Sequence, residues 1–224
     1  MRKPLIAAIL ACVSFAASAG EADIRKALES RLGKVESLNR SPLPGLWEAS
    51  VDGQVFYTDD KGEYLLSGNL IEIKSGKNLT SLRQFNALPF ELALKQVRGS
   101  GKNVLVTFED PNCGFCKRLA KELQVVKDVT VYTFLFPVLG EDSTQKAQAI
   151  WCASDRTRSW DDWMLGGKVP PPKPEKCDLT GLQKSMELGR KLRVSGTPTL
   201  FFATGERVGG YIPATEIEKR FKAN

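Results

Sequence analysis

The sequence predicts two domains of different class, a small α+β domain followed by a larger α/β domain. Short segments rich in β-branched and aromatic residues, separated by turn residues, fill much of the first third of the chain. Further along, two long apolar segments flank an amphipathic helical segment, an order typical of a βαβ unit. A hydrophobic fraction of 42% over 224 residues supplies enough apolar side chains for a core.

The chain opens with a segment that has the character of an export signal. Arg2 and Lys3 precede an apolar run over residues 5–17, and Ala17-Ser18-Ala19 has the pattern that signal peptidase cleaves. We therefore expect residues 1–19 to be a cleaved signal peptide. The alternatives are an uncleaved membrane anchor, for which the run is short, and lipidation at Cys12.

The charge pattern argues against a nucleic-acid partner. Loss of Arg2 and Lys3 with the signal lowers the formal net charge from +6 to +4, and the remaining basic residues are interleaved with acidic ones. A nucleic-acid-binding protein is expected to concentrate its basic residues in one patch. We therefore predict no nucleic-acid partner.

The first domain is predicted over residues 20–80, as one helix on a small antiparallel sheet. Apolar residues recur at helical spacing over residues 21–32, and Gly33 is placed to end that helix. Strands are predicted over residues 46–51, 54–58, 63–66 and 70–73, with turns rich in Gly and Asp between them. This region contains no cysteine and no histidine, so we expect it to carry no catalytic residues.

A linker helix is predicted over residues 81–88, capped by Thr80 and closed by Pro89. The second domain then spans residues 89–224. It begins with a segment that fits a strand or a helix, followed by the βαβ unit, a mostly helical stretch and a final ββα unit. The strands are expected over residues 103–108, 129–136, 199–203 and 207–211, and the helices within 114–126, 144–192 and 214–221.

The sequence Cys113-Gly114-Phe115-Cys116 stands where the first βα connection is predicted. A CxxC at this place in a βαβ unit indicates a thioredoxin-like redox motif. Free backbone N–H groups at the helix start favour a thiolate at Cys113, and Cys116 lies one turn further on the same side. Cys113 is therefore the expected nucleophile and Cys116 the resolving thiol. Gly114 leaves the turn uncrowded, while Phe115 presents a ring beside the attacking sulfur.

Other uses of the CxxC pair fit the sequence less well. Zinc usually takes four ligands, yet the chain has no histidine and no second CxxC, so we predict no metal and no cofactor. A purely structural disulfide would close a loop too short to restrain the unfolded chain. The absence of histidine also excludes Ser-His-Asp and Cys-His hydrolases.

A second signal is Thr197-Pro198, just before a predicted strand, where a cis proline is permitted. Together with residues 109–123, 149–154 and 161–166, this segment makes the chain resemble the periplasmic disulfide-bond isomerases of the DsbC type. The resemblance covers essentially all of the chain after the signal.

The resemblance implies a cystatin-like α+β dimerisation domain, a helical linker and a thioredoxin-like α/β catalytic domain with a helical insertion. It also implies a cis Pro198 packed against the active-site disulfide, with Thr197 and Pro198 shaping the substrate site. The implied partners are mis-oxidised exported proteins, a second copy bound through the N-terminal domain, and a membrane reductant of the DsbD type. The implied compartment is the periplasm.

Two positions depart from the related patterns. Ordinary thioredoxins carry a buried aspartate six positions before the first cysteine, where this chain has Thr107, with Glu109 and Asp110 close by. Phe115 stands where the isomerases usually have tyrosine, which removes a hydroxyl from the neighbourhood of the thiolate.

Cys152 and Cys177 complete the even number of cysteines expected after export. In an oxidising compartment we expect them to form a structural disulfide, worth about 3–4 kcal/mol through loop closure. A free pair used in catalysis is the alternative.

The predicted function is that of a disulfide isomerase or reductase. Two alternatives compete with it, a dithiol oxidase and a chaperone-like holder of unfolded chains. The additional domain without catalytic groups favours the isomerase.

Overall fold

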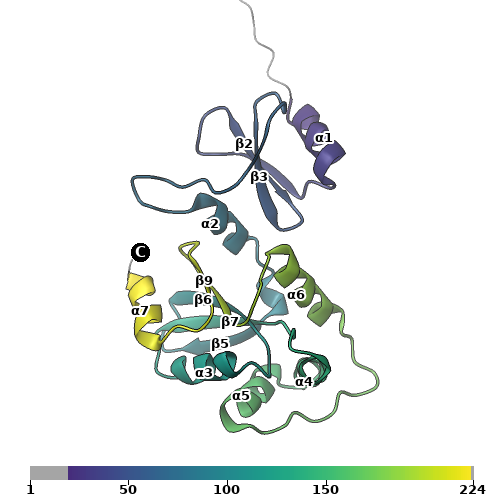
Figure 1. Ribbon diagram of the computed structural model, residues 1–224, viewed down its shortest axis with the longest axis vertical. Helices are drawn as coiled ribbons and strands as arrows, with labels where there is room; N and C mark the ends of the chain where they lie inside the picture. Colours follow the sequence, from purple (N-terminus) through teal and green to yellow (C-terminus); the bar gives the residue numbers. More distant parts are fainter. Residues whose placement is uncertain (1–19, 223–224) are drawn as a thin grey trace, which may run out of the picture.

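The computed structural model describes residues 20–222, and the predicted signal peptide and Cys12 lie outside the described residues. The chain forms a small N-terminal domain and a larger C-terminal domain, with helix α2 (Leu79–Asn86) between them (Figure 1). Both predicted domain classes are confirmed. Within the described part of the chain, no helix is long and apolar enough to cross a membrane.

The N-terminal domain packs one helix against a four-stranded antiparallel sheet. Helix α1 (Glu21–Leu32) precedes strands β1 (Ser37–Arg40), β2 (Leu46–Val51), β3 (Gln54–Asp59) and β4 (Leu65–Ser67), which pair in chain order. Ile24 and Leu28 face the sheet from α1 and share a buried cluster with Trp47 and Ala49 of β2. The core of this domain therefore lies between α1 and the sheet.

The structure differs from the local predictions at two places in this domain and at the start of α2. Strand β1 was not predicted, because its sequence Ser-Leu-Asn-Arg buries only Leu38 and shows no repeated alternation. Residues 70–73 form no strand beyond an isolated bridge at Ile71, since Ile73 is 96% exposed and has no core to cover. The cap of α2 is Asn78, which accepts from the Ser81 N–H, rather than Thr80.

Thr80 has a different role from the predicted one. Its hydroxyl is buried and lies 2.5 Å from the Tyr57 hydroxyl of β3, and it also accepts a hydrogen bond from the Leu70 N–H. The side chain therefore attaches α2 to the N-terminal sheet.

The C-terminal domain contains the predicted βαβ unit. A 3₁₀ turn, η1 (Phe90–Leu92), leads into β5 (Leu94–Arg98), and β6 (Asn103–Glu109) is joined to the parallel strand β7 (Val129–Leu135) by α3 (Gly114–Glu122). The start of this domain, whose sequence fits a strand or a helix, is therefore a short 3₁₀ turn followed by an edge strand. Hairpin β8 (Thr199–Phe202) and β9 (Arg207–Gly209) and helix α7 (Ala214–Lys222) complete the domain. The sheet order is β5-β7-β6-β8-β9.

Helices cover both faces of this sheet. Leu119 of α3, Leu123 just after that helix and Ile217 of α7 pack on one face. The opposite face is rich in phenylalanine and packs against residues of α2, η1 and α6 (Thr180–Lys191). Between β7 and α6, helices α4 (Glu141–Trp151) and α5 (Arg156–Gly166) form the helical insertion beside the CxxC motif.

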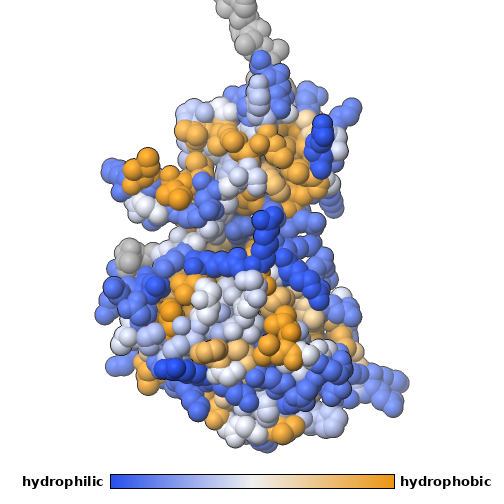
Figure 2. Space-filling view, in the orientation of Figure 1, coloured by the Kyte–Doolittle hydropathy of each residue, from blue (hydrophilic) through white to orange (hydrophobic). Residues whose placement is uncertain are grey.

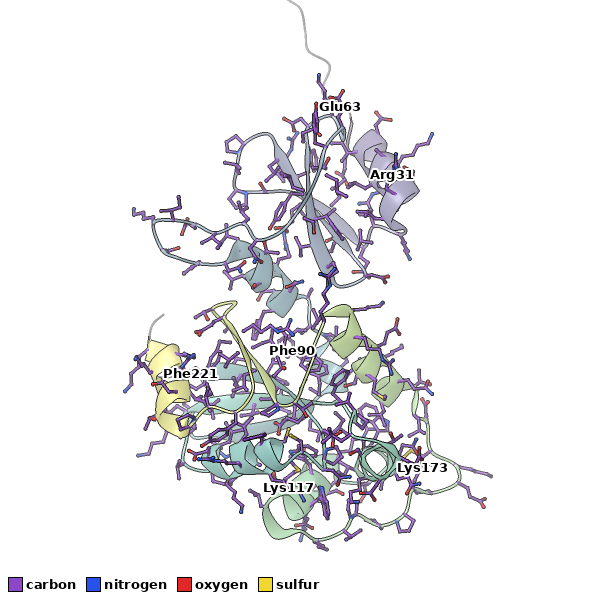
Figure 3. The ribbon with its side chains drawn as sticks, in the orientation of Figure 1. Arg31, Glu63, Phe90, Lys117, Lys173 and Phe221 are labelled. Atoms are coloured by element: carbon purple, nitrogen blue, oxygen red, sulfur yellow. A yellow bond between two sulfur atoms is a disulfide. The ribbon has the colours of Figure 1, made fainter. Side chains whose placement is uncertain are left out.

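Helix α2 belongs to the packing of both domains. Phe85, and Leu88 just beyond the helix, are buried in the C-terminal cluster, while Arg83 forms an ion pair with Glu48 of β2. Figure 3 shows Phe90 at the junction of the two domains. A further ion pair between Asp52 and Lys191 of α6, 2.9 Å long, links the domains directly.

Candidate active site

The CxxC motif lies where β6 ends and α3 begins. Cys113 is the N-cap residue of α3, and Cys116 is on the first turn. Both are free thiols and both are buried, Cys116 completely. The free N–H groups of the first helical turn favour a negative charge on a sulfur at this place. The geometry therefore suits nucleophilic attack by Cys113, with Cys116 placed behind it.

The segment predicted to carry a cis proline faces this sulfur. The Thr197–Pro198 peptide bond is cis, and the Cys113 Sγ donates a hydrogen bond of 3.2 Å to the Thr197 carbonyl oxygen. The two motifs are separated by 84 positions in the chain, and they meet because β6 pairs with β8 in antiparallel register. Predicted site residues from both motifs thus come together.

Gly114 and Phe115 stand on the outer side of the motif. Phe115 is 61% exposed, so its ring is available to a polypeptide approaching Cys113. A Cβ atom at Gly114 would meet no atom within 4 Å. The glycine therefore leaves open space at the surface, and no contact inside this chain requires it.

Asp110 organises the turn before Cys113. Its carboxylate is fully buried and accepts four hydrogen bonds. One oxygen accepts from the Asn112 N–H at 2.7 Å and the Ser143 hydroxyl at 2.8 Å. The other oxygen accepts from the N–H groups of Val138 and Leu139 at 2.7 and 2.9 Å. Asp110 thus ties the turn to the segment after β7 and to α4.

Trp163 of α5 supports the same turn from the helical insertion. Its indole N–H donates a hydrogen bond of 2.6 Å to the Pro111 carbonyl oxygen. The Lys117 ammonium lies 4.0 Å from the centre of the Trp163 ring, and Figure 3 shows Lys117 beside α3 and α5. A cation–π contact of this kind holds the positive charge close to the start of α3.

Two buried groups, Glu109 and Cys116, have strongly perturbed proton affinities. Burial raises the pKa of the Glu109 carboxyl to about 7, while hydrogen bonds from the Thr107 and Thr133 side chains act in the opposite direction. Burial also raises the pKa of the Cys116 thiol, and the nearby charge of Glu109 raises it further. A cluster of such groups is typical of functional sites.

Cys152 and Cys177 form a disulfide away from the CxxC motif. Cys152 is the C-cap residue that follows α4, and Cys177 lies in the loop before α6, so the bond joins two segments of the helical insertion. The same loop carries Lys173, which is half-buried and is labelled beside α4 in Figure 3. A purely structural role for this disulfide, with no part in catalysis, remains a prediction.

Sequence reasoning noted Glu109 and Asp110 but gave them no role. The signal in the sequence was two consecutive acidic residues at the end of an apolar strand, where burying a charge is energetically unfavourable. Trp163 left no usable signal, because its partner is a backbone carbonyl 52 positions away. Among the described residues no group of three or more metal-ligating side chains occurs.

Comparison with known proteins gives consistent relatives for both domains. Residues 90–224 match the family of thioredoxin-like domains, and residues 15–81 match the N-terminal domain of disulfide bond isomerase proteins. A probable thiol:disulfide interchange protein DsbC of Bordetella parapertussis is 43% identical over 193 residues, which cover 83% of this chain and 68% of that protein.

Two further relatives extend this likeness. The thiol:disulfide interchange protein DsbC of Escherichia coli K12 is 30% identical over 220 residues, which cover 94% of this chain and 91% of that protein. A crystal structure of a disulfide interchange protein from Neisseria gonorrhoeae superposes with a TM-score of 0.57 at 39% identity. It covers 61% of this chain and 98% of that chain.

Proposed function

The chain belongs to the DsbC family of thiol:disulfide interchange proteins, and we propose that Cys113 and Cys116 are its reactive pair. As a member of this family it is a thiol-disulfide oxidoreductase that isomerises or reduces incorrect disulfides. One observation carries the assignment to this pair. Cys113 caps α3 with its sulfur 3.2 Å from the Thr197 carbonyl oxygen, while Cys116 lies one turn behind it.

The reaction begins when the Cys113 thiolate attacks a disulfide of the client protein. One client sulfur becomes bonded to Cys113, and the other leaves as a thiolate. A second client thiol can then attack the mixed disulfide, which releases the client with a new pairing and leaves the enzyme reduced. Alternatively Cys116 attacks, the client leaves reduced, and Cys113 and Cys116 form a disulfide.

That second outcome consumes two electrons from the pair, so a reductant must restore it. We propose a membrane reductant of the DsbD type as the donor, exported proteins as the clients and the periplasm as the compartment. The proposal rests on the export-type leader in the sequence and on kinship with the family.

We further propose that two copies associate through the N-terminal domain, taken as residues 20–80 and joined by residues 81–88 to a catalytic domain of residues 89–224. All three residues of the edge strand β4 are exposed, and apolar surface gathers on this domain in Figure 2. Its exposed large side chains are Leu43, Tyr64, Leu65, Leu66, Ile71 and Ile73. An open strand edge with apolar neighbours favours pairing with another chain.

The assignment is tested by recovery of activity from scrambled ribonuclease. Cys113→Ser is expected to abolish recovery, whereas Cys116→Ser is expected to accumulate mixed disulfides with the client. The matched control is Cys177→Ser with Cys152→Ser, which removes two sulfurs outside the motif and should leave the first attack intact. Normal isomerisation by Cys113→Ser would refute the assignment.

The direction of electron flow is tested by the thiol state of the pair in cells. An isomerase or reductase is kept mostly reduced, while an oxidase would be mostly oxidised. The exposed apolar residues of the N-terminal domain also favour a second function in holding unfolded chains. A Cys113→Ala, Cys116→Ala double variant that still suppresses client aggregation would support that function, and loss of suppression would contradict it.

A further inference from the structure

Lys117 of α3 is a cation beside the reactive pair that the fold leaves without a counter-charge. Its side chain is half-buried, and its ammonium lies 4.0 Å from the centre of the Trp163 ring. Among the described residues Lys117 forms no ion pair, whereas Lys168, which follows α5, pairs with Asp162. A lysine held over an aromatic face keeps its positive charge, so an acidic group of another molecule can still pair with it.

Two contacts place this charge next to Cys113. The Lys117 N–H donates a hydrogen bond of 3.0 Å to the Cys113 carbonyl oxygen, four positions earlier. Residues four apart lie on one face of a helix and helical side chains lean toward its N-terminus, so the Lys117 side chain extends back toward the start of α3. There the Trp163 indole donates a hydrogen bond of 2.6 Å to the Pro111 carbonyl oxygen. The ammonium on this ring therefore lies beside the turn that comes directly before Cys113.

A second lysine lies near the same ring, but its charge is compensated. The Lys146 ammonium of α4 is 5.0 Å from the centre of the Trp163 ring and forms an ion pair with Asp142. Asp142 also accepts a hydrogen bond of 2.7 Å from the Asn112 amide. Of the two ammonium groups on this ring, only that of Lys117 is thus free of a carboxylate within the described part of the chain.

The other charged residues near the motif are buried or lie on another side of α3. Glu109 and Asp110 are 1% and 0% exposed, so a client cannot contact their carboxylates. The Arg118 guanidinium lies 4.3 Å from the centre of the Tyr211 ring, next to the segment between β9 and α7. A client that approaches Cys113 from the helical insertion therefore meets Lys117 as the accessible cation.

Given the reactive pair of the proposed function, we propose that the Lys117 ammonium, held on the Trp163 ring, recognises an acidic side chain next to the disulfide of the client. Attraction to this charge brings the client disulfide to Cys113 more often and leaves the exchange chemistry as described above. The preferred partner is thus a polypeptide whose disulfide lies in an acidic segment, and a basic segment is disfavoured.

The size of the preference follows from the exposure of the site. An ion pair that remains partly in contact with water contributes little, which corresponds to about a two- to fivefold change in rate. Salt should weaken this preference, because the Debye length falls from about 10 Å at 0.1 M salt to about 3 Å at 1 M.

The test measures how fast the reduced full-length protein forms a mixed disulfide. A Cys116→Ser background stops the reaction after the first attack. Three fluorescent peptide disulfides are compared, which differ only in whether the residue next to the cysteine is glutamate, glutamine or lysine. At low salt the glutamate peptide should react about two- to fivefold faster than the glutamine peptide, and the lysine peptide should be the slowest. The three rates should converge at about 1 M salt.

Variants of Lys117 show whether this residue is the source of the preference. In Lys117→Gln the glutamate and glutamine peptides should react equally fast, whereas Lys117→Arg keeps the charge and should keep the preference. The ratio of the two rates is measured on one protein, so a general effect of the substitution on the Cys113 sulfur cancels. The matched control is Lys121→Gln, which removes an exposed lysine one turn further along α3 and should keep the ratio of the parent.

A further variant tests the part played by the ring. Trp163→Leu removes the aromatic face, so the ammonium is no longer held beside the turn and the ratio should shrink. Circular dichroism checks that this variant is folded. An undiminished ratio in the folded variant would overturn the role of Trp163.

Equal rates for the three peptides at low salt, or a preference that persists in Lys117→Gln, would overturn the inference while the reactive pair stands. A mixed disulfide that still forms when Cys113 is also replaced by serine would instead overturn the proposed function.

Discussion

Asp110→Asn should destabilise the catalytic domain severely, although it alters few atoms. The carboxylate accepts four hydrogen bonds at 2.7–2.9 Å, two of them from the backbone N–H groups of Val138 and Leu139. An asparagine oxygen can accept from two of these donors. Its NH₂ group must then face the other two, which leaves buried donors opposite a donor.

The magnitude follows from the number of bonds lost. A hydrogen bond to a charged group contributes about 1.5–3 kcal/mol, so the loss of two gives about 3–5 kcal/mol after relaxation. Urea unfolding of the parent and the variant, followed by tryptophan fluorescence, measures the difference, since Trp163 lies beside this turn.

The matched control is Asp142→Asn on the neighbouring helix α4. Asp142 also bonds to the turn, through the Asn112 amide, and pairs with Lys146, but its side chain is 70% exposed. An exposed pair of this kind contributes at most about 1 kcal/mol. If Asp110→Asn costs no more than Asp142→Asn, the organising role assigned to Asp110 is wrong.

Three further predictions concern stability. Replacing Cys152 and Cys177 by alanine opens a loop of 25 positions and should lower the free energy of unfolding by about 3–4 kcal/mol in urea; a loss below about 1 kcal/mol would contradict it. The folded state raises the pKa of Glu109 from 4.5 to about 7, so it holds that proton more tightly than the unfolded state. This contribution is fully present below about pH 4.5 and is lost as the pH rises through 7, by about 3 kcal/mol. As the pH rises between these values, the Glu109→Gln variant should therefore become more stable relative to the parent. A difference in the free energy of unfolding that does not change with pH would argue against the raised pKa. Gly205→Ala would place a Cβ 2.8 Å from the Leu82 backbone nitrogen at a φ of +83°. This substitution should lower the melting temperature and weaken the packing of α2 against the β8–β9 turn. An unchanged melting temperature would show that the two segments can move apart at little cost.

The sequence alone was enough to predict much of the fold and the reactive pair. The apolar runs of β6 and β7, with the amphipathic α3 between them, indicate a parallel βαβ unit through local periodicity. The helix α1 has the predicted bounds, Glu21–Leu32. The CxxC spacing places both sulfurs on one side of a helix start. Each of these features depends on residues that lie close together in the chain, so it can be recognised from the sequence alone.

The surroundings of the pair were decided by the tertiary structure. Cys113 meets Thr197 across 84 positions, and Asp110 gathers donors 28 to 33 positions away. Whether Glu109 is solvated or buried beside Cys116 depends on how closely α3 packs on β6. Likewise, the sequence predicts Thr80 as a helix cap, and only the folded structure shows that its hydroxyl contacts the Tyr57 hydroxyl instead. Hydrogen-bond partners and burial arise from the packing of distant segments, and no local pattern in the chain encodes which segments meet.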